Sequence, residues 1–269
     1  MKIAVLMPTY GRPRLVENAI GLFRMQSYHD RARLYVYDDG GQLPSTLAED
    51  FIIATSTIRA KSIVAKYDVL AELAINDGAT HFAILDDDDI FLPNHLEACA
   101  KAIENWPQSG WAKPAQVFST YSDDPAHPRL QRESAIGRFW ASLLITVPAW
   151  KKAGGFVDTD RADFDQLFLS RCTSQLGPAA IPLEESFCFR WHDTWHYHSQ
   201  GFITHPEDTE WYRRIGNSPL AAPLKPHPVL TPGVDAGTLA TMRAIAETYK
   251  ADKFGPLPES FWPAWVRTF

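Results

Sequence analysis

The chain is poor in cysteine, with three such residues among 269, and none of them forms a Cys-x-x-Cys pair. An odd and sparse set of this kind argues against the disulfide framework of a small secreted domain. It also argues against a zinc site built from cysteines. We therefore expect a protein of a reducing compartment, the cytoplasm.

Long hydrophobic runs are also missing. The apolar run at the N-terminus, residues 3–7, stops at Pro8 and is too short for a signal peptide. The longest apolar stretch elsewhere, residues 139–150, is well below the roughly 20 residues that a membrane-spanning helix needs. We expect a soluble protein without an integral membrane segment.

An excess of basic residues is absent as well, since 26 Lys and Arg stand against 32 Asp and Glu, for a formal net charge of −6. Nonspecific binding to nucleic acids depends on basic side chains that neutralise phosphates, so we expect no such partner. Hydrophobic residues make up 45% of the chain, which excludes a disordered or collagen-like protein.

The first 105 residues alternate between short apolar runs, which predict buried strands, and apolar residues at helical spacing. The predicted strands span 3–7, 34–37, 52–54 and 81–85, and the predicted helices begin near Pro13, Ile63 and Pro93. This β-α-β-α-β order predicts an α/β fold, with a Rossmann-like, mostly parallel sheet and helices on both faces.

Three polar clusters directly follow three of these strands. They are residues 8–12, 38–41 and 86–89, and the last consists of four consecutive aspartates. Ligands bind beyond the carboxyl ends of the strands in such sheets, so we expect the clusters to meet at one edge. A hard divalent cation such as Mg²⁺ or Mn²⁺ would relieve the repulsion among the aspartates; a solvated acidic turn before a helix is the alternative.

The second half of the chain is less regular. We expect a strand over 139–147, a short helix and turn over 150–156, and helices from Asp163 and over 236–250. The C-terminal aromatic residues at 261–265 are expected to pack back onto the body.

The three clusters, in this order and at this spacing, resemble the motifs of inverting family 2 glycosyltransferases with the GT-A fold. Residues 82–93 look like the family's DxD segment, residues 7–13 like its opening loop, and residues 36–41 like its second nucleotide-contacting segment. The resemblance covers residues 1–105 well and 139–200 more loosely. It implies metal-dependent transfer of a sugar from a nucleotide diphosphate sugar to a hydroxyl acceptor, with inversion at the anomeric carbon. UDP sugars are the first candidate donors.

The resemblance also implies roles for single residues. The nucleotide-binding set it implies is Pro8, Thr9, Tyr10, Arg12, Asp39, Lys66, Asp86 and Asp87. Asp39 would hydrogen-bond the base, and Asp88 would hold Mn²⁺ or Mg²⁺ as a Lewis acid. Which of Asp86 and Asp87 pairs with Asp88 stays open. Arg12 could instead cap its loop, and Lys66 could be a solvated helix lysine.

The catalytic base and a further metal ligand are assigned to the second half. Asp163 follows a Gly-Gly-Phe segment at 154–156 as in the family and would deprotonate the acceptor hydroxyl, with Asp165 as the fallback. Taken alone, Asp163 would be a helix N-cap. A late His-Ser pair resembles one that contacts the metal or diphosphate in some members, which indicates His198, with His196 as the alternative.

We expect three regions along the chain. Residues 1–110 would form the nucleotide-sugar-binding half, 111–205 the acceptor-binding and catalytic half of the same domain, and 206–269 an irregular C-terminal extension. The acceptor stays open among a glycan, a small molecule, a protein and a modified nucleobase. Two other functions remain: a nucleotidyltransferase using the same carboxylate and metal chemistry, and a nucleotide-sugar-binding protein without catalysis, which would not need Asp163.

Overall fold

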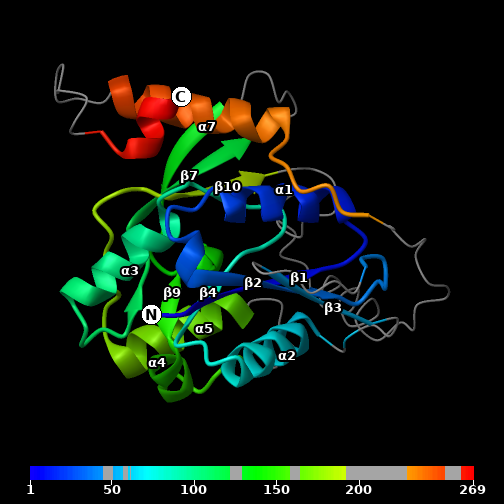
Figure 1. The fold of residues 1–269 in the computed structure, drawn as a ribbon. Helices are drawn as coiled ribbons and strands as arrows, with labels where there is room; N and C mark the ends of the chain where they lie inside the picture. Colours follow the sequence, from blue (N-terminus) through cyan, green and yellow to red (C-terminus); the bar gives the residue numbers. More distant parts are fainter. Residues whose placement is uncertain are drawn as a thin grey trace, which may run out of the picture.

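The structure of the protein is a computed structural model. It describes residues 1–44, 51–56, 60, 62–121, 129–157, 164–191, 229–251 and 262–269. Within these residues the chain forms two β-sheets with helices packed around them (Figure 1). No helix in this described part is long and apolar enough to cross a lipid bilayer.

The larger sheet has six strands in the order β3-β2-β1-β4-β9-β6. Its strands are β1 (Ile3–Thr9), β2 (Ala32–Asp38), β3 (Phe51–Thr55), β4 (His81–Ile84), β6 (Trp111–Ala112) and β9 (Leu144–Thr146). The first four strands in the spatial order run parallel, and β9 runs antiparallel to both of its neighbours. The predicted mostly parallel α/β sheet is therefore confirmed.

Helices cover this sheet. They are α1 (Pro13–Arg24), α2 (Ile63–Asn76), α3 (His95–Asn105), α4 (Val147–Lys152) and α5 (Phe164–Leu176). Figure 1 shows α1 and α2 on opposite sides of the sheet. Because both faces are covered, all seven residues of β1 are buried, which is why its first five residues are a continuous apolar run.

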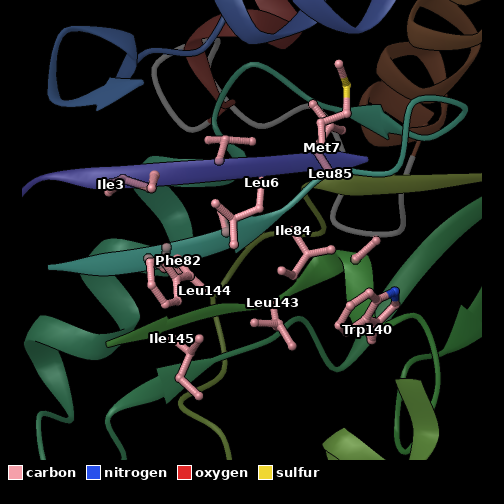
Figure 2. Close-up of a cluster of buried hydrophobic side chains, with 14 of the residues drawn as sticks. Ile3, Leu6, Met7, Phe82, Ile84, Leu85, Trp140, Leu143, Leu144 and Ile145 are labelled. Atoms are coloured by element: carbon pink, nitrogen blue, oxygen red, sulfur yellow. The ribbon is translucent and has the colours of Figure 1, made fainter. Parts of the chain in front are cut away.

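The hydrophobic core lies between β1, β4 and β9 and the helices around them. Figure 2 shows side chains from these three neighbouring strands, among them Leu6, Phe82 and Ile145. Leu6 lies opposite Ile84 in the parallel β1–β4 pair, and Phe82 lies opposite Ile145 in the antiparallel β4–β9 pair. This packing holds the carboxyl ends of β1 and β4 in register.

The expectation of a strand over 139–147 is wrong at both ends. Phe139 has a positive φ of 53°, and a 3-10 turn, η2 (Trp140–Ser142), follows it. The strand is limited to β9, and α4 begins at Val147 after the N-cap Thr146. The physical reason is the Trp140 ring, which packs edge-on against Tyr67 at 4.8 Å, so the chain turns there to place it in the core. An apolar run by itself does not distinguish a strand from such a turn.

A second sheet of four strands was not expected from the sequence. It consists of β5 (Ile90–Phe91), β10 (Phe187–Trp191), β7 (Gln116–Tyr121) and β8 (Arg129–Ser134), in this spatial order. Strand β10 pairs with β5 antiparallel and with β7 parallel. Because β5 directly follows the four aspartates, this sheet borders the polar edge of the first.

The C-terminal helix α7 (Ala236–Ala251) lies over the second sheet (Figure 1). The 3-10 turn η4 (Ala264–Thr268) packs on it, with the Trp265 ring 5.9 Å from Tyr249. The segment before α7 crosses α1 closely, since a Cβ added at Gly21 would lie 2.7 Å from the Gly233 carbonyl carbon. The C-terminal segments thus pack against the N-terminal half.

Candidate active site

The three polar clusters of the sequence lie at one edge of the larger sheet, as predicted. Strands β2, β1 and β4 are parallel neighbours, so their carboxyl ends face the same side. The Thr9 hydroxyl donates a hydrogen bond of 2.6 Å to Asp87 Oδ2, which joins the first cluster to the third. The Lys66 ammonium donates to Asp39 Oδ1 at 2.6 Å and to the Thr9 carbonyl at 3.2 Å, which joins the first to the second.

Arg12 bridges two of the four aspartates. Its Nη1 donates to Asp87 Oδ1 at 2.8 Å and to Asp88 Oδ2 at 2.9 Å. Burial alone would lower the pKa of Arg12, but the two carboxylates outweigh it and raise that pKa. Arg12 therefore does more than cap its loop, because it neutralises charge between the two buried carboxylates.

Asp86 has a different partner from Asp87 and Asp88, namely Tyr67 of α2. The Tyr67 hydroxyl donates to Asp86 Oδ1 at 2.7 Å, and the Tyr67 ring is fully buried. Burial, with the nearby charge of Asp88, raises the pKa of Asp86 to about 7, and Asp165 adds to this rise. Asp165 lies in the first turn of α5, so the start of this helix is electrostatically coupled to the aspartate cluster.

Asp89 is the aspartate to which sequence reasoning assigned no role. It is 1% exposed, and its Oδ1 accepts a 3.3 Å hydrogen bond from the Arg190 backbone N–H. Burial, together with the charges of Asp88 and Asp86, raises the pKa of Asp89 well above its ordinary value. The sequence signal that could have identified Asp89 as a site residue is its place in an unbroken run of four aspartates.

Asp38 and Asp39 have different structural roles. The Asp38 carboxylate accepts hydrogen bonds from the backbone N–H groups of Gly40, Gln42 and Leu43, and so holds the turn after β2. Asp39 accepts from Lys66 and from the Ala60 N–H, in the latter case at 3.0 Å.

The remaining members of the predicted nucleotide-binding set, Lys66, Tyr10 and Pro8, differ in how deeply they are buried. Lys66 is 7% exposed, so the alternative of a solvated helix lysine is wrong. Its ammonium lies 5.9 Å from the centre of the Tyr10 ring, and Tyr10 is half-buried at the start of the loop that follows β1. Pro8 is buried within β1. The predicted base Asp163 and the predicted metal ligand His198, like His196, lie outside the described residues.

The chemistry of the aspartate cluster suits a hard cation. Asp88 raises the pKa of both Asp86 and Asp89, so its carboxylate lies where the negative charges converge. Carboxylate oxygens are the donors that Mg²⁺ and Mn²⁺ prefer. In the part of the chain that the structure describes, however, no three His, Cys, Asp or Glu side chains are grouped so as to hold a metal. The donor type therefore fits such an ion, while a bound ion would have to compete with Arg12 for Asp88.

No protein-family model matches the chain, and no curated protein sequence matches it. Solved structures do match. A shorter form of Staphylococcus aureus TarS in complex with UDP-GlcNAc is 14% identical, with a TM-score of 0.53 over 93% of this chain and 72% of that chain. The same form in complex with UDP is 12% identical, with a TM-score of 0.53 over 93% and 71%.

Two further solved structures also match, one over a smaller share of both chains and one with a lower TM-score. An S. aureus TarS structure is 12% identical, with a TM-score of 0.51, over 71% of this chain and 37% of that chain, so this chain spans little more than a third of it. The mannosyltransferase PcManGT from Pyrobaculum calidifontis, in complex with GDP-Man and Mn²⁺, is 15% identical, with a TM-score of 0.49 over 94% and 76%.

The TarS matches show that this chain has the fold of proteins crystallised with UDP and UDP-GlcNAc. The GT-A fold, expected from the three motifs, is thereby confirmed as a fold.

Proposed function

We propose that the protein is a glycosyltransferase that moves a sugar from a nucleotide diphosphate sugar to a hydroxyl acceptor. UDP sugars are the first candidate donors. One observation carries the proposal: the buried aspartates after β4 bond Thr9 and Arg12 at the ligand-binding edge of a GT-A sheet, and Lys66 joins Thr9 to Asp39 after β2 at the same edge. In open α/β sheets this edge is where ligands bind.

The donor would bind through the three strand ends. Two cations, Arg12 in the loop after β1 and Lys66 of α2 beside this loop, can balance the charge of a diphosphate. Pro8, Thr9 and Tyr10 are proposed to line the nucleoside pocket with Asp39. Asp86 and Asp87 would reach the ribose or the metal.

A divalent cation, Mn²⁺ or Mg²⁺, would neutralise the diphosphate leaving group when bound. We propose Asp88 as its central ligand, because the charges of the neighbouring carboxylates converge on Asp88. His198 is proposed as a ligand from the later part of the chain. Arg12 also donates to the Asp88 carboxylate, so Arg12 and the ion would share this ligand.

The acid–base step proposed for this chain's own residues is the removal of the proton from the acceptor hydroxyl. The acceptor hydroxyl oxygen attacks the anomeric carbon as the bond to the diphosphate breaks, and its proton passes to a carboxylate. A single displacement of this kind inverts the anomeric centre. We propose Asp163 as the base. Asp165, two residues on and coupled to Asp86, is the second candidate.

The regions of the chain divide this work. We propose that residues 1–110 bind the donor, that 111–205 bring the acceptor and the base, and that 206–269 complete the domain. The acceptor, whether a glycan, a small molecule, a protein or a modified nucleobase, would contact the second region.

The proposal is tested by incubating the protein with UDP-, GDP- and other nucleotide sugars and Mn²⁺, and by following the release of the nucleoside diphosphate. We expect slow hydrolysis of one donor class and its loss in Asp88→Ala. The matched control is Asp30→Ala, because the Asp30 side chain is 88% exposed. Release of pyrophosphate from a nucleoside triphosphate would instead show a nucleotidyltransferase. Tight donor binding without turnover would show a binding protein.

A further inference from the structure

Arg190 connects three parts of the fold that lie far apart in the sequence. It belongs to β10 of the second sheet, and its Nε donates a 2.6 Å hydrogen bond to the Asp88 backbone carbonyl, 102 residues away. Its backbone N–H donates to Asp89 Oδ1 at 3.3 Å, and its Nη1 donates to the Thr238 hydroxyl of α7 at 3.1 Å. We call Arg190 with these three partners the Arg190 brace.

The brace adds backbone hydrogen bonds to a turn whose side chains are already bonded by Tyr67, Thr9 and Arg12. Residues 86–89 form a turn between β4 and β5, closed by a 3.1 Å bond from the Asp89 N–H to the Asp86 carbonyl. Strand β5 pairs with β10 over two residues only, opposite Phe187 and Cys188. Arg190 lies two residues beyond Cys188 and holds the turn directly.

Charge gives Arg190 a second effect on the same turn. Asp89 is buried with Oδ1 bonded to Arg190, whereas its Oδ2 has no hydrogen-bond partner among the described residues. The Arg190 guanidinium also keeps one buried nitrogen, Nη2, without a partner there. The bond to Oδ1 comes from the Arg190 backbone N–H, while the guanidinium charge favours the ionised Asp89 carboxylate through space and offsets part of the cost of burying it. Removal of Arg190 would therefore both release the Asp88 carbonyl and leave Asp89 less compensated.

The far end of the brace is anchored in turn. Thr238 is 1% exposed, and its N–H donates to Asp235 Oδ1 at 2.7 Å. The Asp235 N–H donates to Asn18 Oδ1 of α1 at 3.0 Å. The first turn of α7 is thus tied to the helix that follows the Arg12 loop, so the position of the Arg190 guanidinium is set from two elements.

We propose that Arg190 is a positioning residue that sets the turn carrying Asp88 and Asp89, and that Thr238 of α7 orients it for this task. The C-terminal helix thereby governs the geometry of the cation and donor site without contacting either ligand. What Asp88 binds rests on the proposed function, whereas the positioning of the turn does not.

The test compares two buried threonines of the same helix. Thr238→Val removes the acceptor of Arg190, while Thr241→Val is the matched control because the Thr241 hydroxyl donates within the helix, to the Gly237 carbonyl. Hydrogen–deuterium exchange of the segment 86–92 is measured in the ligand-free protein. We expect about tenfold faster exchange in Thr238→Val than in Thr241→Val, at similar melting temperatures.

A second variant and a second readout keep the two proposals separate. Arg190→Lys retains the charge, but its single ammonium cannot replace the separate Nε and Nη1 bonds to Asp88 and Thr238, so we expect the same faster exchange. The dissociation constant for UDP with Mn²⁺ should rise about tenfold in both variants. Equal exchange in Thr238→Val and Thr241→Val would overturn the positioning role. Wild-type protein that binds neither UDP nor Mn²⁺ would overturn the proposed function alone, since the exchange result still decides the brace.

Discussion

Lys66 of α2 and Asp39 after β2 form a buried ion pair, with Nζ 2.6 Å from Oδ1 and side-chain exposures of 9% and 0%. The same ammonium donates to the Thr9 carbonyl. The pair therefore joins the ends of β1 and β2 to the helix that covers them, and it fixes the orientation of the carboxylate proposed to meet the nucleoside base.

Loss of the Lys66 charge should destabilise the fold strongly. In Lys66→Met the Asp39 carboxylate stays buried without its cation, and breaking a buried pair in this way lowers the free energy of unfolding by about 3–5 kcal/mol. The double variant Lys66→Met with Asp39→Asn should recover part of this loss. Urea unfolding at pH 7 measures all three proteins.

The matched control for Lys66 is Lys101→Met on α3. Lys101 also pairs with a carboxylate at 2.6 Å, Glu97, but its side chain is 62% exposed. Exposed pairs of this kind contribute about 0.5 kcal/mol or less. Equal losses in the two methionine variants would contradict the importance of burial for the Lys66–Asp39 pair.

Replacing Arg12 should strengthen the response of the protein to metal. In Arg12→Gln the Asp87 and Asp88 carboxylates lose their resident cation, so the metal-free protein is less stable and an added ion has no competitor. We expect the rise in melting temperature on adding Mn²⁺ to exceed that of the wild type by roughly 3 °C or more. Calorimetric scans with and without Mn²⁺ measure this rise.

Arg14→Gln is the control for that experiment, because Arg14 lies exposed two residues away at the start of α1. Its Mn²⁺ response should equal that of the wild type. A smaller response in Arg12→Gln than in Arg14→Gln would show that Arg12 supports the ion instead of competing with it.

Two variants, Asp163→Asn and Asp165→Asn, can identify which carboxylate accepts the proton. Asp163→Asn should leave donor binding within about twofold and reduce transfer by about 10²–10⁴, the usual contribution of a general base. Asp165→Asn should reduce transfer far less. Initial rates of product formation at saturating donor decide between them, and the reverse order of the two effects would assign the base to Asp165.

Lys113 should make stability depend on pH. It is 5% exposed at the end of β6, and burial lowers its pKa from the ordinary value of 10.5 to about 7. Between these two values the unfolded chain binds a proton that the folded protein has lost, so stability rises with pH. The cost of burying the charged amine is fully present below pH 7, on the order of 5 kcal/mol, and is relieved as the pH rises towards 10.5.

The variant that tests this is Lys113→Met, compared with the wild type by urea unfolding at pH 6, 7, 8.5 and 10. The difference between the two proteins isolates Lys113 from other groups that titrate in this range. We expect the variant to gain stability relative to the wild type at pH 6 and this gain to shrink with rising pH. A difference that is constant over the series would refute the lowered pKa.

The four parallel strands of the larger sheet were predictable because each contains a short apolar run, whereas β6 and the bounds of β9 were not. The runs ending at Met7, Tyr37 and Leu85 are continuously apolar, and each leads into polar residues, so both the strands and their shared edge followed from local pattern. The second sheet was not predictable in this way. Strand β8 is exposed and polar over 129–134, and β5 has two residues, so neither carries a periodic signal.

The roles of neighbouring aspartates also lay beyond the sequence. Asp38 and Asp39 are equivalent in any local pattern, yet one holds a turn and the other meets Lys66. The difference arises because α2 brings its lysine to one side of the β2 end. In the same way, Arg190 comes to Asp88 only through the pairing of β10 with β5.

The sequence by itself determined the α/β class, the edge at which the polar clusters meet and the kind of chemistry that four aspartates can serve. These depend on periodicity and residue type, which act over a few neighbouring residues. Only the tertiary structure decided which partner each carboxylate has: Thr9 and Arg12 for Asp87, Tyr67 for Asp86 and Arg190 for Asp89. Those pairings join residues from 19 to 101 positions apart, and packing of separate elements, not local preference, sets such contacts.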